Sequence, residues 1–316
     1  MKKMKLLTLL PLLMMTGLTG CNNNAEFKIG ICQLVSHPAL NKATDGFVKA
    51  VRDGLGKNNV AIDKQLASGD SSTCLVIANK FVNKNVDLIM ANATPALQAV
   101  ANSTRSIPIL GTSVTEYGVA LGIKDFNGIV GGNISGTSDL APLNDQAAMV
   151  KEFVPNAQKV GLFYCSAEAN SLYQIDTVEA ALKKDGLETK RIPFSDSNDL
   201  SMILNANITG LDALYVPTDN VCADNATSID NICRPKKLPV ICGEENICKK
   251  CGIATLSIDY FALGMKTGQM AVEILKNHQD ISKMPIAYDD APVRKFNKTI
   301  CESLGITVPS GYVAIE

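Results

Sequence analysis

The 316-residue chain has no strongly basic segment, only two histidines and no apolar run as long as the roughly 20 residues of a membrane-spanning helix. Lys and Arg total 30 against 31 Asp and Glu, so nucleic acid is not an expected partner. The G-x-S-x-G, P-loop and H-E-x-x-H signatures are also absent. We therefore expect a protein that is not an enzyme and that uses no cofactor.

Residues 1–20 predict a secretory signal, because three lysines precede an apolar stretch at 6–18 that ends in small residues. The sequence LTGC at 18–21 resembles the bacterial lipobox, in which cleavage before the cysteine leaves its sulfur to carry a lipid. An ordinary signal peptide with a cysteine at this position by chance is the alternative. We expect Cys21 to be lipidated and residues 21–26 to form a tether. The protein would then lie outside the cytoplasm, on the bacterial membrane or in the periplasm.

Removal of the signal leaves 296 residues with a net charge of −4, because the signal carries three lysines. This length is enough for two lobes of about 150 residues each. The chain is 46% hydrophobic and contains no low-complexity tract, so we expect it to be globular throughout.

Apolar runs and helical periodicity alternate along both halves of the chain. Strands are predicted at 27–32, 60–66, 86–90, 107–110, 160–164, 188–192, 213–216, 238–241 and 253–256. Helices are predicted at 39–55, 71–83, 94–101, 137–153, 260–276 and 297–304. This alternation favours right-handed βαβ units, and hence an α/β fold with two doubly wound lobes built on parallel sheets.

A glycine-rich segment from 111 to 136 interrupts this alternation, and we assign 116–136 to the crossing between the lobes. Lobe 1 is then expected to comprise 27–115 and about 258–282. Lobe 2 is expected to comprise 137–257 and about 283–316.

Two strand-to-helix turns, one in each predicted lobe, contain small polar residues. The first contains Gln33 and His37, and the second runs from Cys165 through Ser166 to Asn170. Small molecules bind beyond the carboxyl ends of parallel strands. We therefore expect the two turns to face each other across a cleft.

Seven short segments carry a family resemblance, in the same order along the chain. They are 30–40 (GICQLVSHPAL), 93–96 (ATPA), 112–115 (TSVT), 136–139 (GTSD), 166–171 (SAEANS), 215–220 (YVPTDN) and 254–260 (ATLSIDY). With them, the chain resembles the substrate-binding lipoproteins of ABC importers, in particular the group for tryptophan and related aromatic amino acids.

This resemblance implies a type I periplasmic-binding fold, whose two lobes close on a ligand like a hinge. It also implies a small amino acid-like ligand, such as tryptophan, tyrosine or phenylalanine, and an ABC permease as partner. We expect a monomer. A sensor that reports ligand to a receptor and a binder of a different small metabolite are the alternatives. The chain departs from the family at Glu116-Tyr117, where Asp-Pro is usual, and at Cys248 and Cys251.

An amino-acid zwitterion needs partners for both of its charges when the lobes exclude water. For the carboxylate we expect Thr94 and the helix start after it, with the hydroxyl groups of Ser113 and Thr115 nearby. Thr94 as a simple helix cap is the alternative.

The ammonium group of the ligand requires an acidic partner. Asp219 is the first candidate, Glu244 the second and Asp139 the third, because each follows an apolar run or precedes a helix. Each of them could instead cap a helix.

Five further residues complete the predicted site. Gln33 and Asn170 would hydrogen-bond a polar end of the ligand or brace their own loops, and Ser166 lies in the same turn as Asn170. His37 and Tyr173 would flank an aromatic ring, although Tyr173 could equally belong to the core.

The mature chain would keep nine cysteines besides Cys21, and an odd number excludes complete pairing within one chain. Cys248 and Cys251 form a C-x-x-C sequence between two predicted strands, with no second ligand pair for zinc. We expect no metal site there, but a loop disulfide or free thiols.

Overall fold

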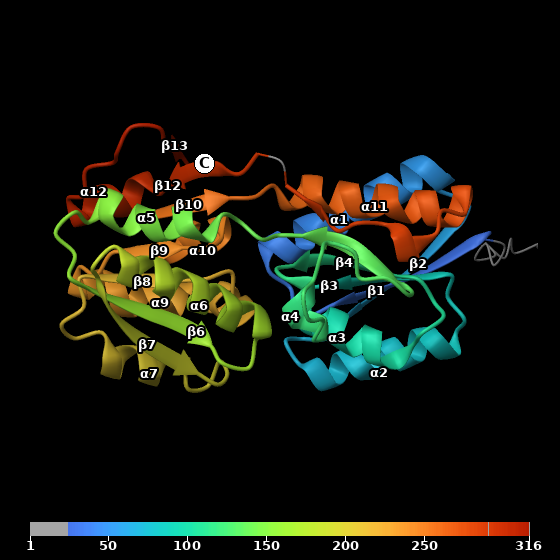
Figure 1. The fold of residues 1–316 in the computed structure, drawn as a ribbon, viewed down its shortest axis with the longest axis horizontal. Helices are drawn as coiled ribbons and strands as arrows, with labels where there is room; N and C mark the ends of the chain where they lie inside the picture. The colour runs from blue at the N-terminus through green and yellow to red at the C-terminus, as the bar shows by residue number, and fades with distance from the viewer. Residues whose placement is uncertain (1–24, 290, 316) are drawn as a thin grey trace, which may run out of the picture.

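The computed structural model of the protein describes residues 25–289 and 291–315. These residues form two lobes side by side (Figure 1), each built on its own sheet. The predicted signal, including Cys21, lies outside the described residues. None of the described helices is long and apolar enough to cross a membrane.

Lobe 1 contains a parallel sheet of six strands in the order β11-β5-β4-β3-β1-β2. The strands are β1 (Phe27–Gln33), β2 (Val60–Leu66), β3 (Leu88–Asn92), β4 (Ile109–Val114), β5 (Ile134–Ser138) and β11 (Ala287–Tyr288). Every residue of β3, β4 and β5 is buried, as expected for strands covered on both faces.

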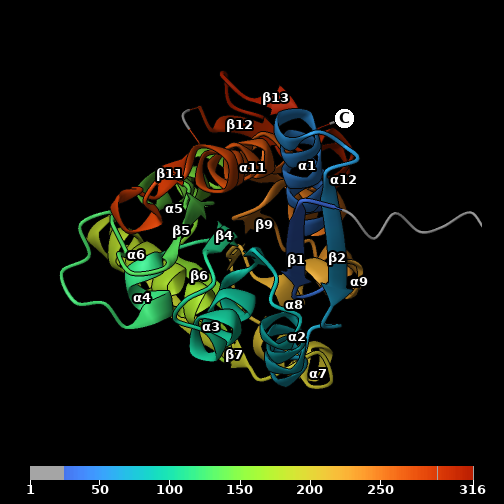
Figure 2. The same ribbon diagram turned by 90° about the vertical axis from the view of Figure 1, so that its right-hand side faces the viewer.

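Helices cover both faces of the lobe 1 sheet. They are α1 (Pro38–Leu55), α2 (Ser71–Asn83), α3 (Thr94–Ser103), α4 (Tyr117–Leu121), α11 (Tyr260–Asn277) and the short η2 (Ile281–Lys283). Figure 2 shows α1 and α11 side by side on one face, with α2 and α3 on the other. Gly264 of α11 permits the close approach to α1, because a Cβ there would overlap the carbonyl oxygen of Ala43.

Lobe 2 contains seven strands in the order β13-β12-β10-β9-β8-β6-β7, of which β10 and β12 pair antiparallel. The strands are β6 (Lys159–Cys165), β7 (Glu188–Phe194), β8 (Ala213–Val216), β9 (Val240–Cys242), β10 (Ala254–Ser257), β12 (Val293–Phe296) and β13 (Val313–Ala314). The helices are α5 (Leu143–Phe153), α6 (Ala169–Lys184), α7 (Leu200–Asn207), α8 (Asn220–Asp224), α9 (Ala226–Cys233), η1 (Arg234–Lys236), α10 (Glu245–Cys251) and α12 (Lys298–Leu304). The predicted fold class of two doubly wound α/β lobes is confirmed.

The crossing between the lobes differs from the prediction. Residues 116–136 do not cross, because β5 pairs with β4 inside lobe 1. The chain instead crosses at three places, between β5 and α5, between β10 and α11, and between β11 and β12. Lobe 1 therefore comprises 27–138 and 260–288, and lobe 2 comprises 143–257 and 293–315.

The glycine-rich segment at 111–136 does not form the crossing between the lobes, and Gly136 instead permits close contact between strands. A Cβ at Gly136 would overlap the Gly111 carbonyl oxygen, so Gly136 allows two neighbouring strands to approach closely. The helix predicted at 137–153 is correspondingly shorter. Thr137 and Ser138 belong to β5, and α5 begins at Leu143 after Pro142.

We expect Gly264→Ala to lower the free energy of unfolding by about 1–3 kcal/mol, although alanine favours a helix more than glycine does. The new methyl group would push α11 away from the backbone of α1, which cannot rearrange cheaply. Urea denaturation would measure the change, with Gln269→Ala on the exposed face of α11 as control. An unchanged midpoint for Gly264→Ala would contradict this account of the helix contact.

Candidate functional site

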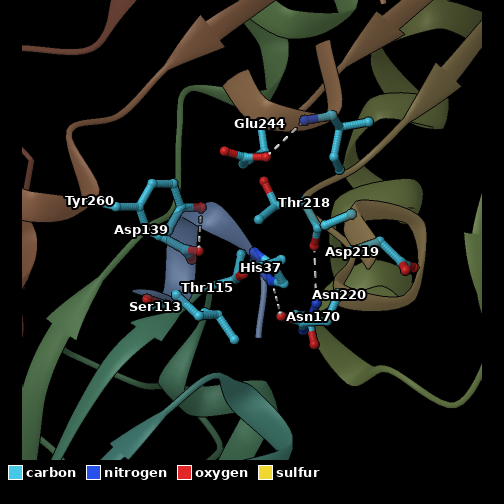
Figure 3. A pocket seen from close by; sticks show the side chains of 13 residues that line it. His37, Ser113, Thr115, Asp139, Asn170, Thr218, Asp219, Asn220, Glu244 and Tyr260 are labelled. Atoms are coloured by element: carbon cyan, nitrogen blue, oxygen red, sulfur yellow. Dashed lines mark hydrogen bonds between the residues drawn. The ribbon is translucent and has the colours of Figure 1, made fainter. Parts of the chain in front are cut away.

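A pocket lies between the lobes, where the carboxyl ends of strands from both sheets meet (Figure 3). Lobe 1 contributes His37, Leu40, Ser113, Thr115 and Tyr260, the crossing after β5 contributes Asp139, and lobe 2 contributes Asn170, Thr218, Asp219, Asn220, Ala223, Glu244 and Ile247. The free volume of this inter-lobe pocket is about 10 Å³, room for about one water molecule. The lobes are therefore closed over it.

The elements explain why these side chains meet. His37 lies between β1 and α1, Ser113 lies in β4, and Asp139 follows β5 directly. In lobe 2, Asp219 precedes α8 and Glu244 precedes α10. Because these positions lie at or just beyond the carboxyl ends of parallel strands, their side chains gather at one edge of each sheet.

The pocket is acidic. Asp139, Asp219 and Glu244 are each at most 3% exposed, and no Lys or Arg is among the residues that line the pocket. Buried charges need a partner or a shifted pKa. The pocket therefore favours a ligand with a cationic group.

Asp219 is already fully engaged by its own lobe. Its Oδ1 accepts a hydrogen bond from the backbone N–H of Cys222, at 2.8 Å. Its Oδ2 accepts one from the N–H of Cys165 and one from the hydroxyl of Ser171, both at 2.7 Å. Burial raises the pKa of Asp219, and these three donors lower it. The carboxylate caps α8 and ties it to β6 and α6.

Glu244 has a similar structural role. Its Oε1 accepts from the N–H of Asn246 at 2.9 Å, and its Oε2 accepts from the N–H of Ile247 at 3.0 Å. Burial raises its pKa, while the two backbone donors lower it. Glu244 therefore caps α10, although it also lines the pocket.

Asp139 is different because half of its carboxyl group has no partner. Its Oδ2 accepts from the hydroxyl of Tyr260 at 2.9 Å, whereas its Oδ1 is buried without a hydrogen bond. Burial raises the pKa of Asp139 to about 6, against the lowering effect of the Tyr260 hydroxyl and of the nearby Thr115 hydroxyl. Asp139 is thus the carboxylate with an acceptor atom free for a ligand.

Four atoms that lack partners gather in this pocket. They are Nδ1 of His37, Oγ of Ser113, Oδ1 of Asp139 and Oδ1 of Asn170. Across the described residues, only three other buried side-chain nitrogen or oxygen atoms lack a partner. Such atoms are rare and destabilising in folded proteins. Their concentration here indicates a ligand that supplies the missing hydrogen bonds.

His37 also joins the two lobes. Its Nε2 lies 3.2 Å from Oδ1 of Asn220, which belongs to lobe 2. The side chain is 6% exposed, and burial lowers its pKa. The contact therefore spans the boundary between the lobes in this closed arrangement.

The backbone at the lobe 1 side of the pocket is strained. Ala93 has a φ of 95° and Ser113 a φ of 52°, and the backbone of residues other than glycine rarely adopts positive φ values. Ala93 follows β3, and Ser113 is the second-last residue of the neighbouring strand β4; of the two, Ser113 lines the pocket. Strain of this kind often accompanies a binding function.

Seven of the predicted site residues line the pocket: His37, Ser113, Thr115, Asp139, Asn170, Asp219 and Glu244. Gln33, Thr94, Ser166 and Tyr173 do not. The local bonding of each explains the difference.

Gln33 braces lobe 1, because its Nε2 donates to Asn41 and its Oε1 accepts from Thr44. The exposed Ser166 donates its hydroxyl hydrogen to the carbonyl of Phe194. Tyr173 packs against the core of lobe 2.

Thr94 is buried without a hydrogen bond to its hydroxyl group. It does not cap α3 either, because Ala93 occupies the cap position. The alternative of a simple helix cap is therefore wrong for this threonine.

Sequence reasoning missed Thr218, Asn220 and Tyr260 as pocket residues. All three lie in two of the segments that carry the family resemblance, 215–220 and 254–260, but only Asp219 is a predicted site residue there. Tyr260 is the first residue of α11 and was counted only as a helix start. Its position at a crossing between the lobes was the available signal.

The cysteines form no disulfide in the described part of the chain, where all nine are free and buried. Cys248 and Cys251 lie in α10 rather than in a loop, and they are free thiols, the second of the two expected alternatives. Among the described residues, no group of three or more His, Cys, Asp or Glu side chains is arranged to hold a metal ion.

Residues 28–314 match the family described as ABC transporter substrate binding protein. The chain is 35% identical over 302 residues to the tyrosine-binding protein of Clostridioides difficile strain R20291, covering 90% of this chain and 87% of that protein.

Two solved structures are similar along most of the chain. An ABC domain from Streptococcus pneumonia in complex with L-Trp has a TM-score of 0.87 at 29% identity, with 92% of this chain and all of that one covered. The ligand-free, open structure of a substrate-binding protein from Clostridium difficile has a TM-score of 0.69 at 38% identity, over the same shares.

The two TM-scores indicate whether the lobes of this structure are open or closed. The chain is more similar in sequence to the open protein but more similar in structure to the L-Trp complex. The likeness to the complex also supports the predicted type I periplasmic-binding fold. Together with the small free volume, the scores place this structure near the closed arrangement.

We expect Asp139→Asn to stabilise the ligand-free protein by about 2–3 kcal/mol at pH 7.5. Folding raises the pKa of Asp139 to about 6, so the folded protein must bury a charge once the carboxyl group ionises. The free energy of unfolding of the wild type therefore falls as pH rises from about 4 to above 6. That of Asp139→Asn does not, because the amide does not ionise. Urea denaturation at pH 4.5 and 7.5 should show that the gain in free energy of unfolding of Asp139→Asn over the wild type is smaller at pH 4.5. Asp219→Asn is the contrast, because it weakens three hydrogen bonds and should destabilise. A loss of stability for Asp139→Asn at pH 7.5 would contradict this reading of the carboxyl group.

Proposed function

This chain belongs to the family of ABC transporter substrate-binding proteins, and from this premise we propose its function. The protein captures an amino acid between its lobes and delivers it to an ABC permease. Proteins of this family act outside the cytoplasm as binding proteins, not enzymes. The observation that carries the proposal is the acidic inter-lobe pocket, with its free acceptor atoms and no lining Lys or Arg.

Asp139 is the proposed partner of the ligand's ammonium group. Its Oδ1 is buried and free, while Tyr260 holds its other oxygen in place. Asp219 and Glu244 add negative potential but already accept hydrogen bonds within lobe 2. An ammonium group at Asp139 would offset the cost of burying this carboxylate.

The ligand's carboxylate is proposed to face Ser113 and Thr115. The hydroxyl of Ser113 is buried without a partner, and the strained backbone at this residue holds it at the pocket. The start of α3 follows the adjacent strand β3, and its free N–H groups favour an anion nearby. Thr94 would support this side of the site from outside the pocket wall.

The side chain of the ligand is proposed to be aromatic. The related protein of Clostridioides difficile is a tyrosine-binding protein, and the Streptococcus pneumonia domain holds L-Trp. A volume of about 10 Å³ is too small for an aromatic ring, so the lobes must part about the three crossings to admit it. Leu40 and Ile247 provide apolar walls.

Lipid anchoring completes the proposal. Cys21 would carry the lipid and residues 21–26 would link it to lobe 1. The protein would work as a monomer at the membrane surface, next to the permease. These expectations rest on the sequence at 18–21.

A thermal-shift screen of the twenty amino acids and of aromatic metabolites tests the ligand class. A ligand at 100 times its dissociation constant adds about 2.7 kcal/mol of stability, which is readily measured. We expect tyrosine, tryptophan or phenylalanine to give the largest shift. If no amino acid raises the melting temperature and another metabolite does, the proposed function is wrong.

The role of Asp139 predicts a pH dependence of binding. Because only the ionised carboxylate pairs with an ammonium group, affinity should fall as pH drops through about 6, the pKa of Asp139 in the folded protein. Asp139→Asn should bind on the order of 10- to 100-fold more weakly at pH 7.5 and lose this pH dependence. Calorimetry between pH 5 and 7.5 would measure both, with Asp145→Asn on the exposed side of α5 as control. Equal affinity of Asp139→Asn and the wild type would remove Asp139 from the site.

A further inference from the structure

Glu168 is a buried carboxylate that does not line the inter-lobe pocket. It occupies the cap position of α6, yet its side chain makes no capping hydrogen bond to that helix. It is 4% exposed and turns toward the start of α8. Its Oε2 accepts from the backbone N–H of Asn220 at 3.1 Å, and its Oε1 accepts from the N–H of Val221 at 3.2 Å.

Two side-chain amides also donate to Glu168. Nδ2 of Asn220 lies 2.7 Å from Oε2, and Nδ2 of Asn170 lies 3.0 Å from the same oxygen. Burial and the charge of Asp219 raise the pKa of Glu168 to about 8, although the hydrogen bonds from Asn170 and Asn220 oppose this rise. Every neighbour of its oxygens is an N–H donor, so the geometry suits the ionised form.

The carboxylate fixes which way each amide points. Because Glu168 and the carbonyl oxygen of Thr218 both accept from the NH₂ group of Asn170, Oδ1 of Asn170 turns away, and it is one of the free atoms of the pocket. By the same argument, Oδ1 of Asn220 turns away from Glu168 and faces His37 across the lobes.

This orientation sets the tautomer of His37. An amide oxygen accepts only, so the His37 nitrogen that lies 3.2 Å from it, Nε2, carries the proton. Burial lowers the pKa of His37 and keeps the ring neutral, so Nδ1 holds a lone pair. This Nδ1 is buried without a partner in the same pocket. Closure of the lobes therefore creates an acceptor at Nδ1.

We propose that Glu168 is a positioning residue that, through Asn170 and Asn220, turns the closed pocket into an array of three acceptors for a primary ammonium group. The acceptors are Nδ1 of His37, Oδ1 of Asn170 and Oδ1 of Asp139. A primary ammonium group carries three N–H donors, one for each of them. This inference rests on the proposed function and defines the chemical group that the site selects.

The first experiment observes His37 directly. The chain has only two histidines, so ¹⁵N-histidine NMR resolves both, and the exposed His278 serves as internal reference. With the bound amino acid found by the screen, the wild type should show a neutral His37 with its proton on Nε2. Glu168→Gln should bind on the order of 10- to 100-fold more weakly and show a mixture of both tautomers. Glu188→Gln, at an exposed site in lobe 2, should match the wild type.

A second variant covers the case in which Glu168→Gln fails to fold. Asn220→Ala keeps the contact of Glu168 with Asn170 but removes the acceptor for His37. It should lose the Nε2 preference of His37, with a smaller loss of affinity than Glu168→Gln. An unchanged tautomer in this variant would overturn the proposed link to His37.

The number of acceptors is tested with an N-methylated form of the same amino acid. N-methylation leaves two N–H donors, so one acceptor of the wild-type pocket stays unpaired and binding should weaken at least tenfold. In His37→Phe the pocket has lost an acceptor, and the penalty for N-methylation should shrink. An equal penalty in both proteins would overturn the array of three.

The outcomes separate the two proposals. If no amino acid binds the wild type, the proposed function fails. If an amino acid binds, but Glu168→Gln keeps both the affinity and the tautomer of His37, the function stands and the role of Glu168 is wrong.

Discussion

The structure depends on a carboxyl group, that of Asp139, which closing lobes bury with one oxygen bonded and one oxygen free. Removing a charged oxygen from water without a partner costs several kcal/mol, unless a proton or a cation accompanies it. The ligand-free closed state is thus penalised at neutral pH, while a state with a bound cation is not. This difference gives ligand-dependent closure a physical cause, because a ligand shifts an equilibrium only by its differential affinity for the two states.

The acidic side chains at the cleft divide into distinct roles although they look alike in sequence. Asp219 and Glu244 hold helix starts in lobe 2 and are satisfied without a ligand. Glu168 orients two amides, and Asp139 faces the pocket with a free oxygen. All four are at most 4% exposed, so burial does not distinguish them. Their hydrogen-bond partners do, and those partners come from several different strands and helices.

This division marks the limit of sequence-based inference here. Apolar runs predicted the strands β1 to β4 and β6 to β10, and polar residues after strands led to His37 and Asn170. Asp139 was named only as a residue at a predicted helix start, because β5 was not predicted. The cap that Asp219 forms at α8 was a stated alternative, but its two other partners lie 48 and 54 residues away along the chain and were not visible in the sequence. The crossing was misplaced because glycine was taken as a sign of a loop, whereas Gly136 allows close contact between two strands. Tertiary contacts decided each of these cases.

The nine free cysteines have a consequence for the life of the chain before it folds. Each is buried in the native state, several of them in the core of lobe 2, where oxidants and alkylating reagents do not reach them. An unfolded chain exposes all nine sulfur atoms at once. Outside the cytoplasm, where disulfides form readily, such a chain can cross-link wrongly before it reaches the native state. Burial of the thiols on folding, rather than covalent bridging, then keeps this protein from its own thiol chemistry.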